Sequence, residues 1–140
     1  SSYSQSGNVI CETSISAKEL ARHIHQLILE KIGANLAIIV KEKSDLEKAI
    51  LQNPFPEELD SSRIHLVFTN SHISTERLTE VREMNFTDEI FAVGETCLYM
   101  YLSRDARIKK LNNNFLEKKL GTVATTRKLT IIKKLINRMD

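Results

Sequence analysis

The residues best suited to chemistry lie near the end of the 140-residue chain, where two threonines are followed by two cations. We expect this run to enter the last helix, so that free backbone N–H groups, hydroxyls and cations converge on a phosphate or sulfate. Two further cations share one arc with the arginine, opposite the apolar stripe. The alternative is a threonine N-cap before an amphipathic helix with a basic solvent face. The candidate anion-binding residues are Thr125, Thr126, Arg127, Lys128, Lys134 and Arg138.

A second candidate is the run Ser6-Gly7-Asn8, which places a hydroxyl on a tight turn. No Gly-x-Ser-x-Gly elbow surrounds Ser6 and no partner base accompanies it, so hairpin geometry competes with a serine nucleophile. His23 and His25 stand two apart on a predicted helix, whereas metal ligands on one helix face stand three or four apart. The cysteines are typical of inert small hydrophobes. We expect no metal and no cofactor.

Apolar residues occupy both faces of a predicted hairpin that turns around Gly94. A two-residue loop there would pair Ala92 with Cys97. Something must cover each face, and we expect helices on one and another subdomain or protomer on the other. The functional interpretation makes Tyr99 and Tyr101 a stacking platform for bases or an interface with a partner.

Composition describes an ordinary globular chain, because 41% of the residues are hydrophobic and the formal net charge is +2. The length predicts a single domain over residues 1–140. Two cysteines are too few for a disulfide framework or a four-ligand zinc site and fit a reducing cytoplasm. No apolar run approaches the roughly 20 residues of a membrane span. The first eight residues do not form an export signal. We therefore expect a cytoplasmic protein without a membrane partner.

Charge is distributed unevenly along the chain. Residues 1–103 hold 9 Lys and Arg against 15 Asp and Glu, whereas residues 104–140 hold 11 against 3, so the two parts carry −6 and +8. A basic segment of this kind favours phosphate-bearing partners, including nucleic acid. The alternative is two solvated surfaces of opposite sign.

Hydrophobic spacing, capping boxes and turn residues predict the order of elements. The expected elements are a hairpin at 3–11, a helix at 16–33, a strand at 36–40, a helix at 44–53, a strand at 63–69, a helix at 75–84, a hairpin at 89–102, a helix at 113–120 and a last helix starting near 126. This order predicts an α+β fold with mixed or antiparallel sheets, in approximate halves 1–53 and 54–140.

Residues 3–9, which read Tyr-Ser-Gln-Ser-Gly-Asn-Val, and residues 110–127 carry a family resemblance. They are similar to the N-terminal and C-terminal motifs of an uncharacterised, mainly bacterial family, domain of unknown function 1697. The resemblance implies two packed ferredoxin-like halves. Family members usually begin with a further strand and helix upstream of Ser1, so we expect an incomplete first half whose unpaired edge invites self-association. The family also shows Asn-Trp where this chain has Lys128-Leu129, so no role of that pair is carried over.

These observations favour a non-enzymatic binding module that engages a phosphate-bearing partner through its basic C-terminal region. One alternative is a small hydrolase or transferase with a site between the two halves, formed by Ser6, Asn8 and Arg127. A third is an interaction protein that acts as a homodimer. The family resemblance implies a fold but no reaction.

Overall fold

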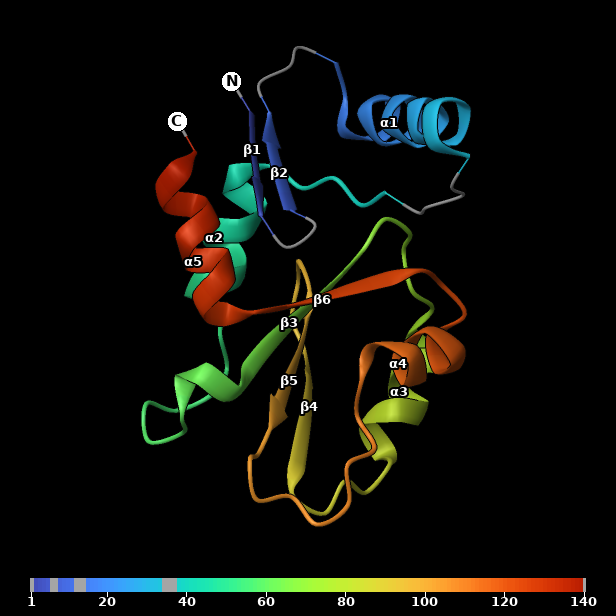
Figure 1. Ribbon diagram of the computed structural model, residues 1–140. Helices are drawn as coiled ribbons and strands as arrows, with labels where there is room; N and C mark the ends of the chain where they lie inside the picture. Colours follow the sequence, from blue (N-terminus) through green and yellow to red (C-terminus); the bar gives the residue numbers. More distant parts are fainter. Residues whose placement is uncertain (1, 6–7, 12–14, 34–37, 140) are drawn as a thin grey trace.

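The computed structural model describes residues 2–5, 8–11, 15–33 and 38–139 (Figure 1). Four strands form one antiparallel sheet in the order β4-β5-β3-β6. Their bounds are β3 Ile64–Thr69, β4 Glu89–Val93, β5 Leu98–Leu102 and β6 Ala124–Lys128. The chain thus has an α+β fold, as predicted, and its larger sheet is antiparallel throughout.

Two helices complete the pattern of a ferredoxin-like unit. Helix α3 (Thr75–Glu83) connects β3 to β4, and α4 (Asn113–Leu120) connects β5 to β6. The resulting βαββαβ order, with the first strand beside the last, is the ferredoxin-like arrangement. The second half of the chain therefore has the topology that the family resemblance implies.

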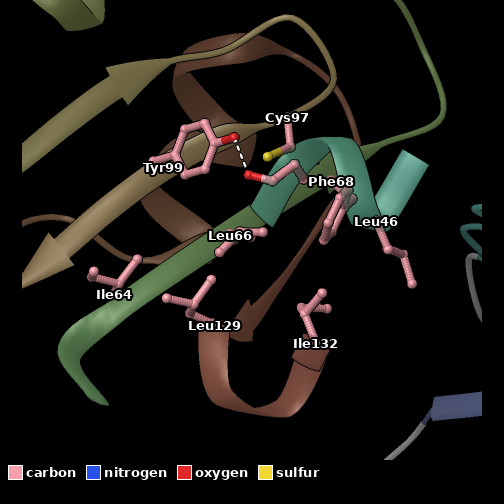
Figure 2. Packing of buried hydrophobic residues seen from close by; sticks show 9 residues of the cluster. Leu46, Ile64, Leu66, Phe68, Cys97, Tyr99, Leu129 and Ile132 are labelled. Atoms are coloured by element: carbon pink, nitrogen blue, oxygen red, sulfur yellow. Dashed lines mark hydrogen bonds between the residues drawn. The ribbon is translucent and has the colours of Figure 1, made fainter. Parts of the chain in front are cut away.

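Apolar side chains are buried on both faces of this sheet, because helices cover both. One cluster joins β3 and β5 to α2 (Lys43–Leu51) and α5 (Leu129–Arg138), as Figure 2 shows. The other joins the opposite faces of the same strands to α3 and α4. Of the two helices in the first cluster, α2 comes from the predicted first half of the chain and α5 from the second. The buried members of the first cluster are Leu46, Ala49, Ile64, Leu66, Phe68, Cys97, Tyr99, Leu129 and Ile132.

The hairpin of β4 and β5 has a longer turn than its sequence predicts. Ala92 pairs with Tyr99, not with Cys97, and the Gly94 N–H donates to the Cys97 carbonyl at 2.9 Å across a four-residue turn. The observed pairing register is shifted by two residues from the predicted one, and alternate residues of a strand share a face. The predicted faces are therefore right although the predicted partners are wrong. A Cβ at Gly94 would lie 2.6 Å from a ring carbon of Tyr99, so a glycine lets the turn approach that ring.

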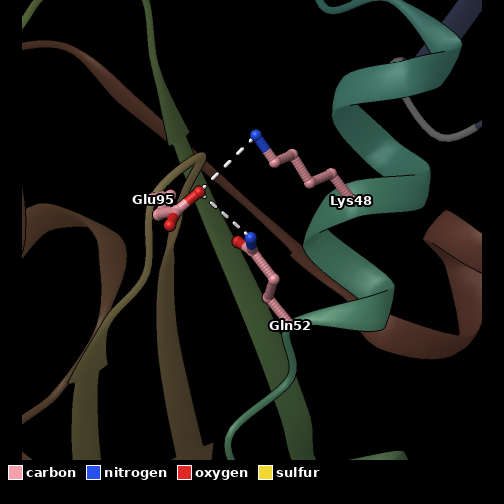
Figure 3. Close-up of polar contacts among 3 residues, drawn as sticks. All are labelled: Lys48, Gln52 and Glu95. Atoms are coloured by element: carbon pink, nitrogen blue, oxygen red, sulfur yellow. Dashed lines mark hydrogen bonds and ion pairs between the residues drawn. The ribbon is translucent and has the colours of Figure 1, made fainter.

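Side chains at the end of helix α2 make polar contacts with this turn. The Glu95 carboxylate accepts a hydrogen bond from Gln52 Nε2 at 3.2 Å and lies 3.5 Å from Lys48 Nζ (Figure 3). The Gln52 hydrogen bond and then the Lys48 charge lower the pKa of Glu95. The helix begins at Lys43 with a capping box formed by Glu42 and Asp45, two residues before the predicted one. The predicted end near residue 53 is close to the observed end.

The N-terminal elements are a hairpin and a long helix. Strand β1 (Ser2–Gln5) pairs with β2 (Asn8–Cys11) as predicted, and helix α1 runs over Ala17–Ile32. Ser16 caps the start of α1, and Gly33 ends it with a φ of 79°, which glycine adopts readily. No residue of α1 is buried. The predicted strand at 36–40 falls partly outside the described residues, and residues 38–40 form no strand.

A short 3₁₀ turn, η1 (Ser61–Arg63), precedes β3. The Asp60 carboxylate caps it by accepting hydrogen bonds from the Ser62 hydroxyl at 2.7 Å and the Ser62 N–H at 3.0 Å, and these bonds lower the pKa of Asp60.

None of the described helices has the length and apolar character that a membrane span requires.

Candidate functional site

The predicted anion-binding threonines lie in strand β6, not at the start of a helix. In the pairing of the edge strand β6 with β3, Thr125 lies opposite Phe68 and Arg127 lies opposite Leu66. Helix α5 begins at Leu129, and its N-cap residue, Lys128, makes no capping hydrogen bond with its side chain. The expectation that the threonines enter the last helix is therefore corrected. Their β-branched side chains suit a strand, and pairing with β3 supplies backbone hydrogen bonds that a cap would not.

Side chains of α4 bind the outer edge of β6. The Ala124 N–H donates to Glu117 Oε2 at 2.9 Å, and the Ala124 carbonyl accepts from Asn113 Nδ2 at 2.9 Å. The Thr126 hydroxyl donates to Asn113 Oδ1 at 2.8 Å. Edge strands expose unpaired backbone groups, and these contacts satisfy two of them. Asn113 and Glu117 are not among the candidate residues predicted from the sequence. Their spacing of four residues, on one face of the helix before the strand, is the signal that identifies them.

Arg127 joins β6 to the N-terminal hairpin. Its Nε donates to Asn8 Oδ1 at 2.7 Å, and its Nη1 donates to the Thr125 hydroxyl and to the Thr126 carbonyl, both at 2.9 Å. The side chain is half-buried. All of these partners are neutral oxygen atoms, so the contacts orient the guanidinium group without neutralising it. Asn8, near the start of the chain, and Arg127, near its end, are thus in direct contact.

The remaining candidate cations lie at the end of β6 and along α5. The side chains of Lys128, Lys133, Lys134 and Arg138 are exposed. Leu129 and Ile132 bury the opposite side of α5 in the core. Arg127 belongs to the strand, so it does not share the helical arc that the sequence predicts for it with Lys134 and Arg138. We call residues 127–138, with these five cations, the basic segment.

The serine turn is described only at its last residue. Ser6 and Gly7 lie outside the described residues, while Asn8 opens β2 and accepts the Arg127 hydrogen bond. Asn8 and Arg127 lie close together, as the alternative of a site between the two halves predicts. The position of the Ser6 hydroxyl relative to them is not described.

The two tyrosines of β5 lie in different environments. Tyr99 is 0% exposed, and its hydroxyl donates to the Ala49 carbonyl at 2.6 Å, as Figure 2 shows. Burial raises the pKa of Tyr99. Its ring meets Phe55 edge-on, with the centroids 6.4 Å apart, and the half-buried Tyr101 also packs against Phe55 at 6.0 Å. The structure thus places Tyr99 in the core, where neither ring face can stack on a base.

The histidines and cysteines form no metal site in the part of the chain that is described. His65 is half-buried in β3, and burial lowers its pKa. Both cysteines are free thiols. Cys11 is exposed, whereas burial raises the pKa of Cys97 to about 11 and keeps it protonated.

Comparison with protein-family models matches residues 1–99 to the family described as "Protein of unknown function (DUF1697)". The match covers the N-terminal hairpin with Asn8 and ends at Tyr99, so the second motif, at residues 110–127, lies beyond it. Searches of curated proteins and of solved structures found no match. Because the family model covers more than half of the 140 residues, the chain belongs to this family of proteins of unknown function.

Proposed function

We propose that this protein is a non-enzymatic binding module for a phosphate-bearing partner, which it engages through the basic segment. The observation that carries the proposal is the environment of Arg127. Its guanidinium group is half-buried and oriented by three hydrogen bonds, all to neutral oxygens. An oriented cation without a bound carboxylate attracts an anion more strongly than a freely rotating surface lysine does.

Along the sequence, the residues on either side of Arg127 carry charge of one sign. Residues 118–139 contain no Asp or Glu, and their cations are Lys118, Lys119, Arg127, Lys128, Lys133, Lys134 and Arg138. Among the described residues, the one salt bridge joins Lys48 of α2 to Glu95 in the turn between β4 and β5. Lys128, Lys133 and Lys134 are thus exposed to solvent, and no carboxylate of the described residues lies in salt-bridge range of them. Such clusters raise the local concentration of anions and accelerate their association.

Nucleic acid is the polyanion that we propose to test first. Lysine side chains contact phosphates as point charges, and such contacts carry no sequence information. The buried ring of Tyr99 offers no surface for stacking bases. We therefore expect binding that is governed by phosphates, depends steeply on salt and is indifferent to sequence.

Fluorescence anisotropy with generic single-stranded and double-stranded oligonucleotides tests this proposal, at about 50 and about 200 mM salt. The double variant Lys133→Ala/Lys134→Ala removes two exposed cations from α5 without touching its apolar side. We expect weaker binding to every sequence, and a plot of log affinity against log salt whose slope falls by about two, one for each lost phosphate contact.

The matched control is Lys18→Ala/Lys31→Ala, which removes two exposed lysines from α1 and changes the net charge equally. We expect the control to bind like the unchanged protein. Absence of binding at the lower salt concentration contradicts the proposal. Equal weakening by both double variants also contradicts it, because the attraction would then depend on net charge alone.

The contact between Arg127 and Asn8 supports a second candidate, a small hydrolase with Ser6 as its nucleophile. The observation in its favour is the 2.7 Å hydrogen bond from Arg127 to Asn8, which is the second residue after Ser6 in the sequence. Hydrolysis of p-nitrophenyl phosphate or p-nitrophenyl acetate that disappears in Ser6→Ala would favour this candidate over a binding module. Equal background rates in both proteins would remove it.

A further inference from the structure

An open groove of about 420 Å³ separates α1 from the loops at one end of the sheet. In Figure 1 the loop after β3 and the start of β6 lie below α1. A volume of this size falls within the range of small-molecule sites. The polar residues that line it are Arg22, His25, Asn70, Ser71 and Thr122.

Local contacts hold the floor of the groove in place. Asn70 Nδ2 donates to the Ile38 carbonyl at 2.5 Å, which ties the segment after α1 to the loop after β3. The Thr69 hydroxyl donates to the Ser71 carbonyl at 2.9 Å and folds that loop on itself. The Ser71 side chain therefore stands on a loop that is fixed at two points. Oriented donors of this kind lose less conformational entropy when they bind a ligand.

The guanidinium group of Arg77 lies against the turn that leads into Thr122. Gly121, at the end of α4, has a φ of 67°, and a Cβ there would stand 2.7 Å from Arg77 Nη1. Arg77 Nη1 also donates to the Lys119 carbonyl at 3.4 Å. Glycine thus allows Arg77 to lie against the residue that precedes Thr122, one of the lining residues. The carboxylate of Glu117, in α4, accepts a hydrogen bond from the Ala124 N–H.

The chemistry of the lining is complementary to an anion with an apolar body. Arg22 carries a permanent charge, and the hydroxyls of Ser71 and Thr122 donate hydrogen bonds. No Asp or Glu is among the described residues that line the groove. Ala21 and Val123 add apolar surface. A phosphate group accepts hydrogen bonds from several directions at once, whereas a carboxylate accepts them in one plane.

We propose that this groove binds a small phosphorylated molecule, with its phosphate at Arg22, Ser71 and Thr122 and its organic part against the apolar lining. The site is separate from the basic segment and goes beyond the function proposed above. It takes a small ligand instead of a polymer, and neither lysine of the α5 double variant lines it.

Titration of the isotopically labelled protein with phenyl phosphate, followed by amide chemical shifts, tests this proposal. We expect saturable shifts at Arg22, Ser71 and Thr122, and weaker binding of both inorganic phosphate and phenylacetate. Arg22→Ala should weaken phenyl phosphate binding about tenfold, because a charged hydrogen bond is lost. Thr122→Val, which keeps the side-chain shape, should weaken it a few-fold.

The control is Lys18→Ala, which removes an exposed cation from the same helix outside the groove. It should leave the affinity within about twofold, because exposed charges at a distance are screened. Circular dichroism establishes that all variants fold. Shifts confined to the basic segment, equal affinities of Arg22→Ala and Lys18→Ala, or no saturable shift would overturn the proposal. An outcome of this kind leaves the oligonucleotide experiment unaffected, since its probe and variants differ.

Discussion

The four-stranded sheet and helix α1 differ in how far their apolar side chains are buried. Leu66 of β3 and Leu116 of α4 are fully buried on the two faces of the sheet. In α1, by contrast, no side chain is buried, and Leu27 and Ile32 are 41% and 76% exposed. Burial of apolar surface is the main source of folding free energy. The cooperative stability of this chain therefore resides in the sheet and the helices that cover it.

Helix α1 depends instead on its two ends. The Ser16 side chain accepts a hydrogen bond from the Glu19 N–H at 3.2 Å, and the Gly33 N–H donates to the Leu29 carbonyl at 3.0 Å. Caps contribute about 1 kcal/mol each, whereas a buried leucine contributes several times more. A helix can thus be clearly encoded in the sequence and still add little to global stability.

The largest expected difference between the two regions is in core truncations. Leu66→Ala should lower the free energy of unfolding by about 2–5 kcal/mol, because it opens a cavity between the sheet and α5. Ile24→Ala in α1 should lower it by less than about 1 kcal/mol, since that site is half-exposed and can relax. Urea denaturation measures both. Equal losses would contradict the assignment of stability to the sheet.

Native-state hydrogen exchange sharpens the comparison residue by residue. Amides of β3 and β5, buried between two layers of helices, should exchange only when the whole chain unfolds. Amides of α1 should exchange through local opening, at least about a hundredfold faster. Protection of α1 equal to that of β5 would show that the helix unfolds together with the sheet.

Alkaline pH should destabilise the sheet region through Cys97 and Tyr99. Burial raises the pKa of the Cys97 thiol from 9.0 to about 11 and also raises the pKa of Tyr99. The folded state therefore keeps protons that the unfolded state releases, so stability is complete below pH 9 and falls as the pH rises toward 11. The expected slope is about 1 kcal/mol per pH unit for each group. Urea denaturation of Cys97→Ala/Tyr99→Phe should show a flatter profile, and an unchanged slope would contradict this account.

The smallest expected effect comes from the cap of α1. Ser16→Ala should increase local opening of α1 by an amount that corresponds to about 1 kcal/mol or less, because one backbone N–H loses its acceptor. The global free energy of unfolding should not change measurably. Hydrogen exchange at Glu19 and the following amides detects the local change. A loss in urea denaturation as large as that of a core variant would contradict the separation of the two regions.

The elements were largely predictable from the sequence because local signals encode them. The alternation of apolar residues predicted correctly which side chains of β5 share a face. The turn is two residues longer than predicted, but the faces are unchanged because side chains alternate with a period of two. The capping serine and the final glycine fixed α1 at both ends. Local signals misplaced the start of α5, because Thr125 and Thr126 pair with β3, and that pairing is a contact between distant parts of the sequence.

The candidate site was predictable only in its residue types. The sequence grouped Asn8 with Arg127 only in the alternative of a site between the two halves. The hydrogen bond that joins them spans 119 residues and follows from how the hairpin meets the edge of β6. The exclusion of Tyr99 from any stacking surface likewise depends on α2, which covers that face. Neither periodicity nor composition reports on such tertiary contacts.

The most direct test of the proposed function changes only the charge beside Arg127. Asn8→Asp keeps an oxygen that accepts the Arg127 Nε hydrogen bond but gives the guanidinium group a carboxylate partner. Asn85→Asp, at an exposed site between α3 and β4, makes the same change in net charge and is the control. Oligonucleotide anisotropy should show weaker binding by Asn8→Asp, with a salt slope reduced by about one, and unchanged binding by Asn85→Asp. Equal affinities of the two variants would contradict the claim that the uncompensated charge of Arg127 attracts the phosphate-bearing partner.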